Sequence, residues 1–336
     1  MHIPDGVLSL PTTLATGAIA LAGLSVAVSK LSARNRDRTT VLMGTMAAFV
    51  FAAQMVNFPL YPFPISGHLL GGVLAAVMLG PWAGAGVMAV VLIVQCLLAG
   101  DGGPLSLGAN FLNMGLIGSI GGYAIYAPIR RGLGGSRGVV IGSMAAAWFS
   151  VILASAAFAV ELAASGRMAD FPEILGWMVL VHSVIGVGEA IITGLVVRFV
   201  LQVRPDLILD DDEDSENPRS PARRWGQVAL AGLAIASAVA IFLAPLASTN
   251  LDGLEFVGGR LKFIDPLRET ASALLPVPVP DYEMPGLARW KPLATASAGF
   301  LGTSIVFGVG FGLARVFSER KPLKTVEGRK VEHDEL

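Results

Sequence analysis

The fold class of this chain is decided by the stretch Gly138-Val-Val-Ile-Gly-Ser-Met-Ala-Ala-Ala-Trp-Phe-Ser-Val-Ile-Leu-Ala-Ser-Ala-Ala-Phe-Ala-Val-Glu161-Leu-Ala163. Glu161 is its single charged residue, and as a helix the stretch is long enough to cross a hydrocarbon core of about 30 Å. Over all 336 residues, apolar residues make up 54% and charged residues 15%, and the mean hydropathy is +0.67. These values lie outside the range of soluble globular domains and indicate a multispanning membrane protein.

Eight further stretches are apolar and long enough to be candidate spans. The whole set lies at about 12–33, 40–57, 66–80, 83–99, 107–129, 138–163, 174–202, 226–247 and 294–317. The third and fourth stretches are short and are separated only by Pro81-Trp82, so they could form a tight helical hairpin or a re-entrant pair. We therefore predict an all-α fold, a polytopic membrane helical bundle.

The polar segments divide the chain into two membrane blocks. The first is a seven-span domain, and the second is a two-span block that contains a long external loop. We expect the linker between them to be a disordered cytoplasmic connector that permits association without one rigid geometry. On that basis the second block should matter more for transport than for capture of a substrate. The boundaries are 1–205 for the first domain, 206–224 for the linker, 225–318 for the second block with its loop 248–293, and 319–336 for a charged cytoplasmic tail.

Charge sets the expected orientation and excludes several functions. With the N-terminus outside, the cytoplasmic segments hold most of the 24 Lys and Arg residues, so the C-terminus is expected in the cytoplasm of this multi-pass cell-membrane protein. Residues 1–11 lack Lys and Arg, so the charged region of a signal peptide is missing and Met1 is the expected mature N-terminus. The net charge of −1 gives no nucleic-acid footprint, and no Gly-Lys dipeptide exists for a Walker phosphate loop.

The N-terminal hexapeptide Met1-His2-Ile3-Pro4-Asp5-Gly6 carries the main functional signal. The α-amine of Met1, the backbone amide nitrogen of His2 and the Nδ1 atom of His2 can chelate one metal ion through a five-membered and a six-membered ring. Such a set is nearly planar, which suits Ni(II) or Cu(II) better than tetrahedral Zn(II). The competing interpretation is a solvated N-terminus in which a start codon happens to precede a His codon.

His68 is the predicted fourth ligand. The chain holds four His in all, and the predicted topology puts His68 on the same exterior face as His2. It could supply the remaining in-plane nitrogen. The alternative is an interfacial His that is hydrogen-bonded to a loop carbonyl.

Other polar residues of the apolar half are expected to support the site. Asn110 and Asn113 lie on one helical face, and we favour a second-shell or loop-clamping role for both. Asp101 is expected to close a turn. His182 and Glu189 lie seven residues apart on one face of the seventh predicted span, where ionisable groups are functional candidates, and they could pair with each other or with the asparagine face.

Two other classes of function compete with metal capture. A membrane-embedded metalloenzyme could use His68, His182 and Glu189 to activate a metal-bound water. A filled planar site would leave that water no in-plane position, and the chain has no His-Glu-x-x-His motif. A scaffold for other subunits would leave the hexapeptide without a role.

These motifs together resemble the CbiM/NikM family, the substrate-binding components of energy-coupling-factor transporters for cobalt and nickel. The resemblance covers roughly residues 1–203. The second block is similar to the small CbiN/NikN component, although Leu251 stands where that motif has Pro. The motifs that carry the resemblance are the hexapeptide, Ser66-Gly-His-Leu-Leu-Gly-Gly72, Gly100-Asp-Gly-Gly103, Leu107-Gly-Ala-Asn110 with Asn113-Met-Gly115, His182 through Gly188-Glu-Ala190, and Asp252-Gly-Leu-Glu255.

The resemblance implies a transport component and no enzyme. Its ligands would be the Met1 amine, the His2 amide and imidazole, and a histidine in the position of His68. Its partners would be a transmembrane coupling subunit and cytoplasmic ATPase subunits. It implies no resident cofactor. The transported ion would be Ni(II), with Co(II) next, because planar nitrogen ligation favours nickel and because Ca(II) and Mg(II) prefer oxygen ligands.

Overall fold

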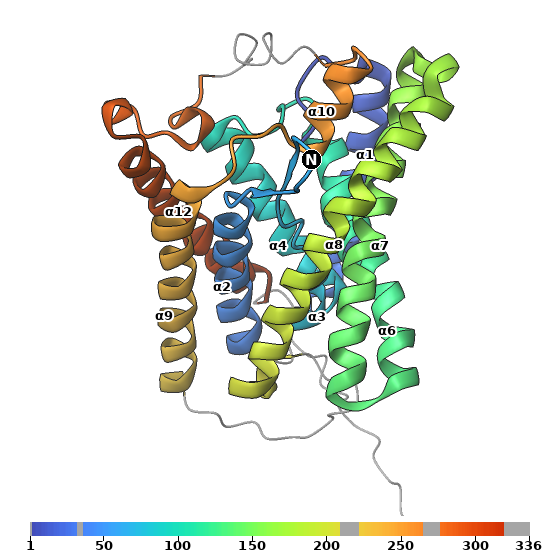
Figure 1. Cartoon of the computed structure of the whole chain (residues 1–336). Coiled ribbons are helices and arrows are strands. Elements are labelled where there is room, and N and C mark those ends of the chain that lie inside the picture. The colour runs from blue at the N-terminus through green and yellow to red at the C-terminus, as the bar shows by residue number, and fades with distance from the viewer. Residues whose placement is uncertain (1, 32–35, 209–221, 265–275, 319–336) are drawn as a thin grey trace, which may run out of the picture.

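A computed structural model of the chain describes residues 2–31, 36–208, 222–264 and 276–318. Met1, the predicted tail 319–336 and most of the predicted linker lie outside the described residues. The described part is a bundle of helices with one small sheet, in which β1 (Phe58–Pro59) pairs antiparallel with β2 (Ser66–Gly67) (Figure 1). The all-α class predicted from the hydropathy pattern is confirmed.

The helices follow the predicted apolar stretches closely, except at the third. Those of the first block are α1 (Leu10–Lys30), α2 (Arg36–Gln54), α3 (Gly72–Leu79), α4 (Pro81–Val94), η2 (Gln95–Ala99), α5 (Leu107–Asn110), η3 (Phe111–Gly121), α6 (Gly122–Leu133), α7 (Gly135–Leu162), η4 (Ala163–Arg167), η5 (Met168–Asp170), α8 (Phe171–Val203) and η6 (Pro205–Leu207). Those of the second block are α9 (Ala222–Ala238), η7 (Val239–Leu243), η8 (Ala244–Leu246), α10 (Gly253–Arg260), η9 (Pro280–Tyr282), η10 (Ala288–Trp290) and α12 (Lys291–Ser318).

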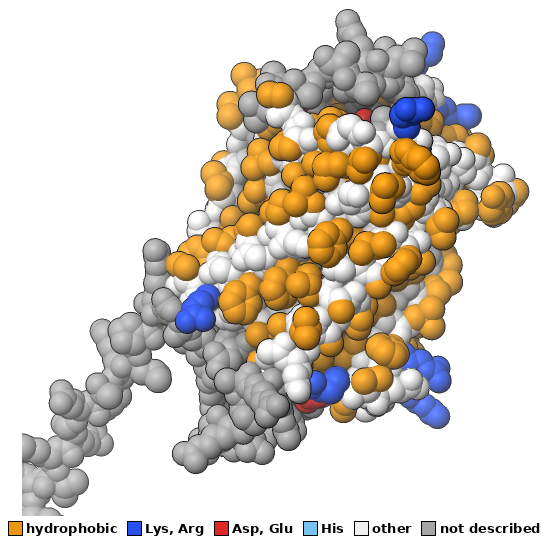
Figure 2. Space-filling model, turned by 90° about the vertical axis from the view of Figure 1, so that its left-hand side faces the viewer, with side chains coloured by type: hydrophobic (Ala, Val, Ile, Leu, Met, Phe, Trp, Pro, Cys, Tyr) orange, Lys and Arg blue, Asp and Glu red, His pale blue; other side chains and the backbone are white. Residues whose placement is uncertain are grey.

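The surface of the bundle is that of a membrane protein. Within the described residues, five helical stretches are long and apolar enough to cross a bilayer. Figure 2 shows hydrophobic side chains over the middle of one side of the molecule, with Lys and Arg gathered toward its two ends. The stretches are Leu10–Lys30, Pro81–Ala99, Gly135–Val203, Trp225–Leu246 and Lys291–Phe317.

The third and fourth apolar stretches form a tight helical hairpin. Helix α3 has only 8 residues and is therefore about 12 Å long, well short of a hydrocarbon core. Helix α4 folds back on it so closely that a Cβ on Gly84 would lie 2.8 Å from the Ala76 nitrogen. At the closed end, Nη2 of Arg38 donates to the carbonyl of Leu207 (3.0 Å). The open end of the hairpin lies beside the N-terminal segment, because Gln95, directly after α4, is 3.2 Å from Nε2 of His2.

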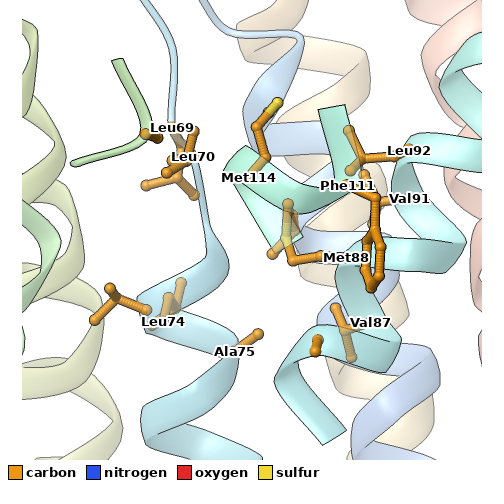
Figure 3. Close-up of a cluster of buried hydrophobic side chains, with 14 of the residues drawn as sticks. Leu69, Leu70, Leu74, Ala75, Val87, Met88, Val91, Leu92, Phe111 and Met114 are labelled. Atoms are coloured by element: carbon orange, nitrogen blue, oxygen red, sulfur yellow. The ribbon is translucent and has the colours of Figure 1, made fainter. Parts of the chain in front are cut away.

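Buried apolar side chains fix this hairpin inside the bundle. Figure 3 shows side chains of α3, α4 and η3 in one cluster. Leu74, Val87, Met88 and Met114 are all fully buried there. Inside a membrane-spanning bundle close packing of this kind, and not removal from water, holds the helices together, so the hairpin is a rigid base for whatever lies at its open end.

The second block packs on the first through α2. A cluster of four small residues joins α2 to α9 and η7, namely Ala48, Ala52, Ala236 and Ala240. A Cβ on Gly310 of α12 would lie 3.3 Å from the Cα of Gly44 in α2, so small residues allow the helices to approach closely. The two blocks thus share a packed interface, which differs from the loose association expected from the linker.

Candidate metal-binding site

The N-terminal segment enters the bundle from one end and is held there by its backbone. Ile3 is fully buried. The Asn110 side chain pairs with it like a neighbouring strand, because Oδ1 accepts from the Ile3 N–H (2.8 Å) and Nδ2 donates to the Ile3 carbonyl (3.1 Å). The Gly103 N–H donates to the same carbonyl (3.0 Å). The position of His2 is therefore set by helix α5 and by the loop that precedes it.

Asp5 holds the next turn of the segment against the same loop. Its Oδ1 accepts from the Ser106 N–H (3.0 Å), and the Ser106 hydroxyl donates to the Pro4 carbonyl (3.1 Å). A Cβ at Gly103 would overlap the Asp5 side chain, so glycine is required at that position. The segment 102–110 therefore has a glycine where the hexapeptide packs closely against it, at Gly103, and an amide side chain that pairs with the hexapeptide backbone, at Asn110.

The His2 ring is buried between three polar neighbours. Its Nδ1 lies 3.0 Å from Oδ1 of Asp101, and its side chain is 7% exposed. Its Nε2 lies 3.2 Å from Oε1 of Gln95. The ring stacks on His68, with centroids 5.3 Å apart and planes inclined by 19°. The competing interpretation, in which His2 belongs to a solvated N-terminus, therefore does not fit this buried ring.

His68 lies in the loop between β2 and α3, at the open end of the hairpin. Its Nδ1 donates to the Leu69 carbonyl (3.0 Å). Burial is the main cause that lowers the pKa of His68 to about 3, and the nearby His2 lowers it further. A neutral ring with a hydrogen on Nδ1 carries its lone pair on Nε2. The structure thus brings both predicted imidazole ligands together, although stacked rings would have to rotate before they could share one planar ion.

Asp101 belongs to this site and does more than close a turn. Besides His2, it contacts a residue of the second block, since the Tyr282 hydroxyl donates to its Oδ2 (2.7 Å). Burial is the largest single influence and raises the pKa of Asp101, but the charge of His2 and the hydrogen bonds from His2 and Tyr282 together outweigh it, so the net pKa is lowered. Burial and the same carboxylate raise the pKa of Tyr282 well above its usual value. Asp101 therefore stays an acceptor and Tyr282 stays a donor.

His182 lies across a small cavity from His68. Its Nδ1 donates to the Met178 carbonyl one turn earlier in α8 (2.9 Å). The cavity, of about 20 Å³, has room for one water-sized group. It is lined by Gly67, His68, Leu70, Val151, His182, Ile185, Asp252 and Gly253. His182 is thus close to a predicted ligand, as the second-shell prediction requires.

Glu189 fixes the segment that follows His68. Its two carboxylate oxygens accept from the N–H groups of Leu70 (2.5 Å) and Gly71 (3.0 Å), where α3 begins. The described contacts of Glu189 and His182 therefore go to backbone groups and not to each other, which differs from the pairing considered above. A carboxylate used in this way is also poorly placed to activate water.

Asn113 does not share the role of Asn110. Its Nδ2 donates to Oε2 of Glu161 in α7 (3.0 Å). It therefore ties η3 to α7. The two asparagines thus contact different parts of the bundle, and Asn110 is the one that holds the N-terminal segment.

Residues that sequence reasoning missed complete the site. Gln54 and Gln95 are buried and hydrogen-bonded to each other, and Tyr282 reaches Asp101 from the long loop of the second block. A glutamine inside an apolar run was the available signal for the first two. No local signal marks Tyr282, whose partner is 181 residues away.

The long loop of the second block, residues 248–293, closes one wall of the cavity. The Ser66 N–H donates to the Leu251 carbonyl (2.8 Å), and the Ser66 hydroxyl donates to the Asn250 carbonyl (2.8 Å). The predicted Asp252-to-Glu255 motif is a capping box that begins α10. A Cβ on Gly253 would lie 3.2 Å from Nε2 of His182. The loop is therefore part of the architecture of the site.

The fold and the site define a class: a polytopic helical membrane protein with an N-terminal histidine buried beside a second histidine. Comparison with known proteins gives the family. Residues 2–207 match the CbiM family, described as the cobalt uptake substrate-specific transmembrane region, and residues 226–319 match the PDGLE domain. The chain belongs to the CbiM family and carries a PDGLE domain in its second block. The resemblance seen in the motifs is thus confirmed.

Individual relatives agree with this assignment. The chain is 35% identical to a putative fused nickel transport protein NikMN of Archaeoglobus fulgidus, over 94% of this chain and 98% of that one. It is 28% identical to the cobalt transport protein CbiM of Geobacter sulfurreducens over 69% of this chain and 68% of that one. A crystal structure of a truncated transition metal transporter matches with a TM-score of 0.53 and 33% identity, over 60% of this chain and 99% of that one. The chain is therefore a metal transport protein and not an enzyme.

Proposed function

We propose that this chain is the substrate-binding component of an energy-coupling-factor transporter that imports a divalent transition metal, with Ni(II) first and Co(II) second. The ion would be held by the Met1 amine, the amide and Nδ1 of His2, and a ring nitrogen of His68. The observation that carries the proposal is the burial of the His2 ring against His68 by a clamped N-terminal segment. A solvated N-terminus would have no reason to be held in this way.

The identity of the ion follows from the chemistry of the donors. Four nitrogen ligands in one plane suit Ni(II), and cobalt in a low-spin state could accept the same set. Relatives named as nickel and as cobalt transport proteins are both similar to this chain. The chain would work with a transmembrane coupling subunit and cytoplasmic ATPase subunits, in line with its lack of a Walker motif. Its N-terminus would face the exterior and its C-terminus the cytoplasm.

The test is equilibrium Ni(II) binding to the purified full chain. One added residue before Met1 turns the α-amine into an amide and removes the outer chelate ring, so high-affinity binding should be lost. The matched control carries the same residue after Leu336. Mass spectrometry of the unextended protein checks that Met1 is retained. Unchanged Ni(II) affinity in the extended protein would contradict the ligand set.

A second variant tests the fourth ligand. His68→Ala should weaken Ni(II) binding strongly, because one of four nitrogens is removed while the N-terminal segment stays clamped. The control is His333→Ala, in the predicted tail. If His68→Ala binds Ni(II) as tightly as the control, His68 is an ordinary loop histidine and another group supplies the fourth ligand.

A further inference from the structure

Two buried glutamines connect the His2 ring to the segment that carries His68. The connection begins at the Leu70 carbonyl, which accepts from Nε2 of Gln54 (2.8 Å). A carbonyl oxygen can only accept a hydrogen bond. The Gln54 amide nitrogen must therefore face Leu70, and its Oε1 must face the opposite way.

The same logic fixes the second glutamine. Oε1 of Gln54 accepts from Nε2 of Gln95 (2.7 Å), so the Gln95 nitrogen faces Gln54 and its Oε1 faces His2. Gln95 is fully buried and Gln54 is 5% exposed, so water offers neither amide an easy alternative. An amide oxygen only accepts as well. The His2 Nε2 atom at 3.2 Å must therefore carry a hydrogen.

Asp101 is an acceptor 3.0 Å from Nδ1, so Nδ1 also carries a hydrogen in the metal-free ring, and an incoming ion would displace that hydrogen while the one on Nε2 stays. Nδ1 is also the atom that closes the six-membered ring with the His2 amide nitrogen. An ion at Nδ1 would replace the present contact with Asp101, whereas the contact with Gln95 lies at the other ring nitrogen and can persist. Outer hydrogen-bond partners of this kind commonly orient metal-binding histidines.

We propose that Gln54 and Gln95 are positioning residues, which keep a hydrogen on Nε2 of His2, so that Nδ1 is the ring nitrogen that gives up its hydrogen to bind the transported ion. This inference rests on the proposed function for the identity of the ion. We call this chain of hydrogen bonds from His2 through Gln95 and Gln54 the relay. It ends at the carbonyl of Leu70, and the N–H of the same residue donates to Glu189. One chain of hydrogen bonds thus positions His2 and the segment beside His68 together.

The first experiment reads the His2 ring directly, without added metal. Two-bond ¹H–¹⁵N correlation spectra of the full chain, with labelled histidine, show which ring nitrogen bears a hydrogen. Substitution of each of the four His assigns the signals. The wild-type protein should show an Nε2–H on His2 that exchanges slowly with solvent. Gln54→Met, although Gln54 does not touch His2, should make that hydrogen exchange rapidly.

The second experiment compares Ni(II) affinities. Gln95→Met removes the acceptor at Nε2, and both it and Gln54→Met should weaken binding roughly ten- to hundredfold. Gln95→Glu keeps an acceptor oxygen toward Nε2 of His2 but loses the donor to Gln54, so its loss of Ni(II) affinity should be smaller than that of Gln95→Met. Gln202→Met, at an exposed position of α8, is the control for the chemical change itself.

Two results would overturn the relay. One is a wild-type His2 without a hydrogen on Nε2. The other is an equal loss of Ni(II) affinity in Gln95→Met and Gln95→Glu, which would indicate packing instead of an acceptor requirement. A failure of the proposed function looks different: the protein extended before Met1 would then bind Ni(II) normally, while the ring spectra would still decide the position of the hydrogen.

Discussion

The two regions that enclose the His2 ring are held in different ways. The N-terminal segment is fixed by hydrogen bonds to its own backbone, from Asn110, Gly103 and Ser106. The long loop of the second block reaches the site through the Tyr282 phenol and the backbone at Gly253. The first region therefore builds the candidate site, and the second covers it. Binding should depend on the first region far more than on the second.

The largest loss of Ni(II) affinity is expected from a substitution of Asn110, which holds the N-terminal segment. Asn110→Leu removes both side-chain hydrogen bonds to Ile3 and leaves a buried N–H unsatisfied, at a cost of about 1–3 kcal/mol for that group. The segment should detach, and Ni(II) affinity should fall by about a hundredfold or more. Asn113→Leu is the matched control, since Asn113 contacts Glu161 and not the segment. Equal losses measured by equilibrium binding in the two variants would show that general destabilisation is the cause.

A smaller effect is expected from the covering loop. In Gly253→Ala the new Cβ would lie 2.5 Å from Cδ1 of Ile185 and 3.1 Å from Cε1 of His182. The loop should lift from α8, because overpacking of this kind costs about 1–3 kcal/mol. Ni(II) should then dissociate faster, and cellular uptake with the partner subunits should drop. The control is Gly226→Ala, because no atom lies near the position of its new Cβ. Gly286→Ala is unsuitable because Gly286 has a positive φ. Wild-type dissociation in Gly253→Ala would mean that the loop does not cover the site.

Much of the fold could be predicted from hydropathy, and the third helix shows where that fails. Leu69 and Leu70 are as apolar as a helical pair, yet they precede α3 and belong to the loop, because Gly71 adopts a positive φ of 83° at its start. Hydropathy records burial and does not distinguish an extended buried strand from a helix. The length of α3 was therefore not predictable from composition.

Candidate ligands could be proposed from the sequence, whereas the surroundings of the candidate site could not. The spacing of the amine, amide and imidazole is local to the first two residues, so chemistry alone suggested it. Partners such as Gln54 and Gln95 come together across 41 residues, and their contact depends on how α2 and the hairpin pack. Asp101 was assigned to a turn for the same reason: its partners, His2 and Tyr282, are remote in sequence.

His68 lies between the N-terminal segment and the covering loop, and it should make the free energy of unfolding depend on pH. Its pKa is lowered to about 3 in the folded protein, against about 6.5 in an unfolded chain. Between these values the unfolded chain binds a proton that the folded protein does not bind. The free energy of unfolding should therefore fall as pH falls from about 6.5 to 3, by at most about 1.4 kcal/mol per pH unit for this group.

The measurement is the thermal unfolding midpoint in detergent across that pH range. His68→Ala should flatten the dependence, whereas His333→Ala should leave it unchanged. Equal slopes in wild type and His68→Ala would indicate that His68 is protonated in the folded protein as readily as in the unfolded chain.

The smallest effect is expected at the Tyr282 hydroxyl, through which the covering loop reaches Asp101. Tyr282→Phe keeps the ring, which packs edge-on against Phe51 at 5.9 Å, and removes only the hydroxyl that donates to Asp101. A hydrogen bond to a charged group contributes about 1.5–3 kcal/mol, but Asp101 retains its contact with His2, so part of this should be recovered. We expect Ni(II) affinity to fall by less than about tenfold, with Tyr61→Phe, at an 86% exposed position, as the control. A loss as large as that of Asn110→Leu would mean that the second block builds the site as much as the first does, and the distinction between the two regions would fail.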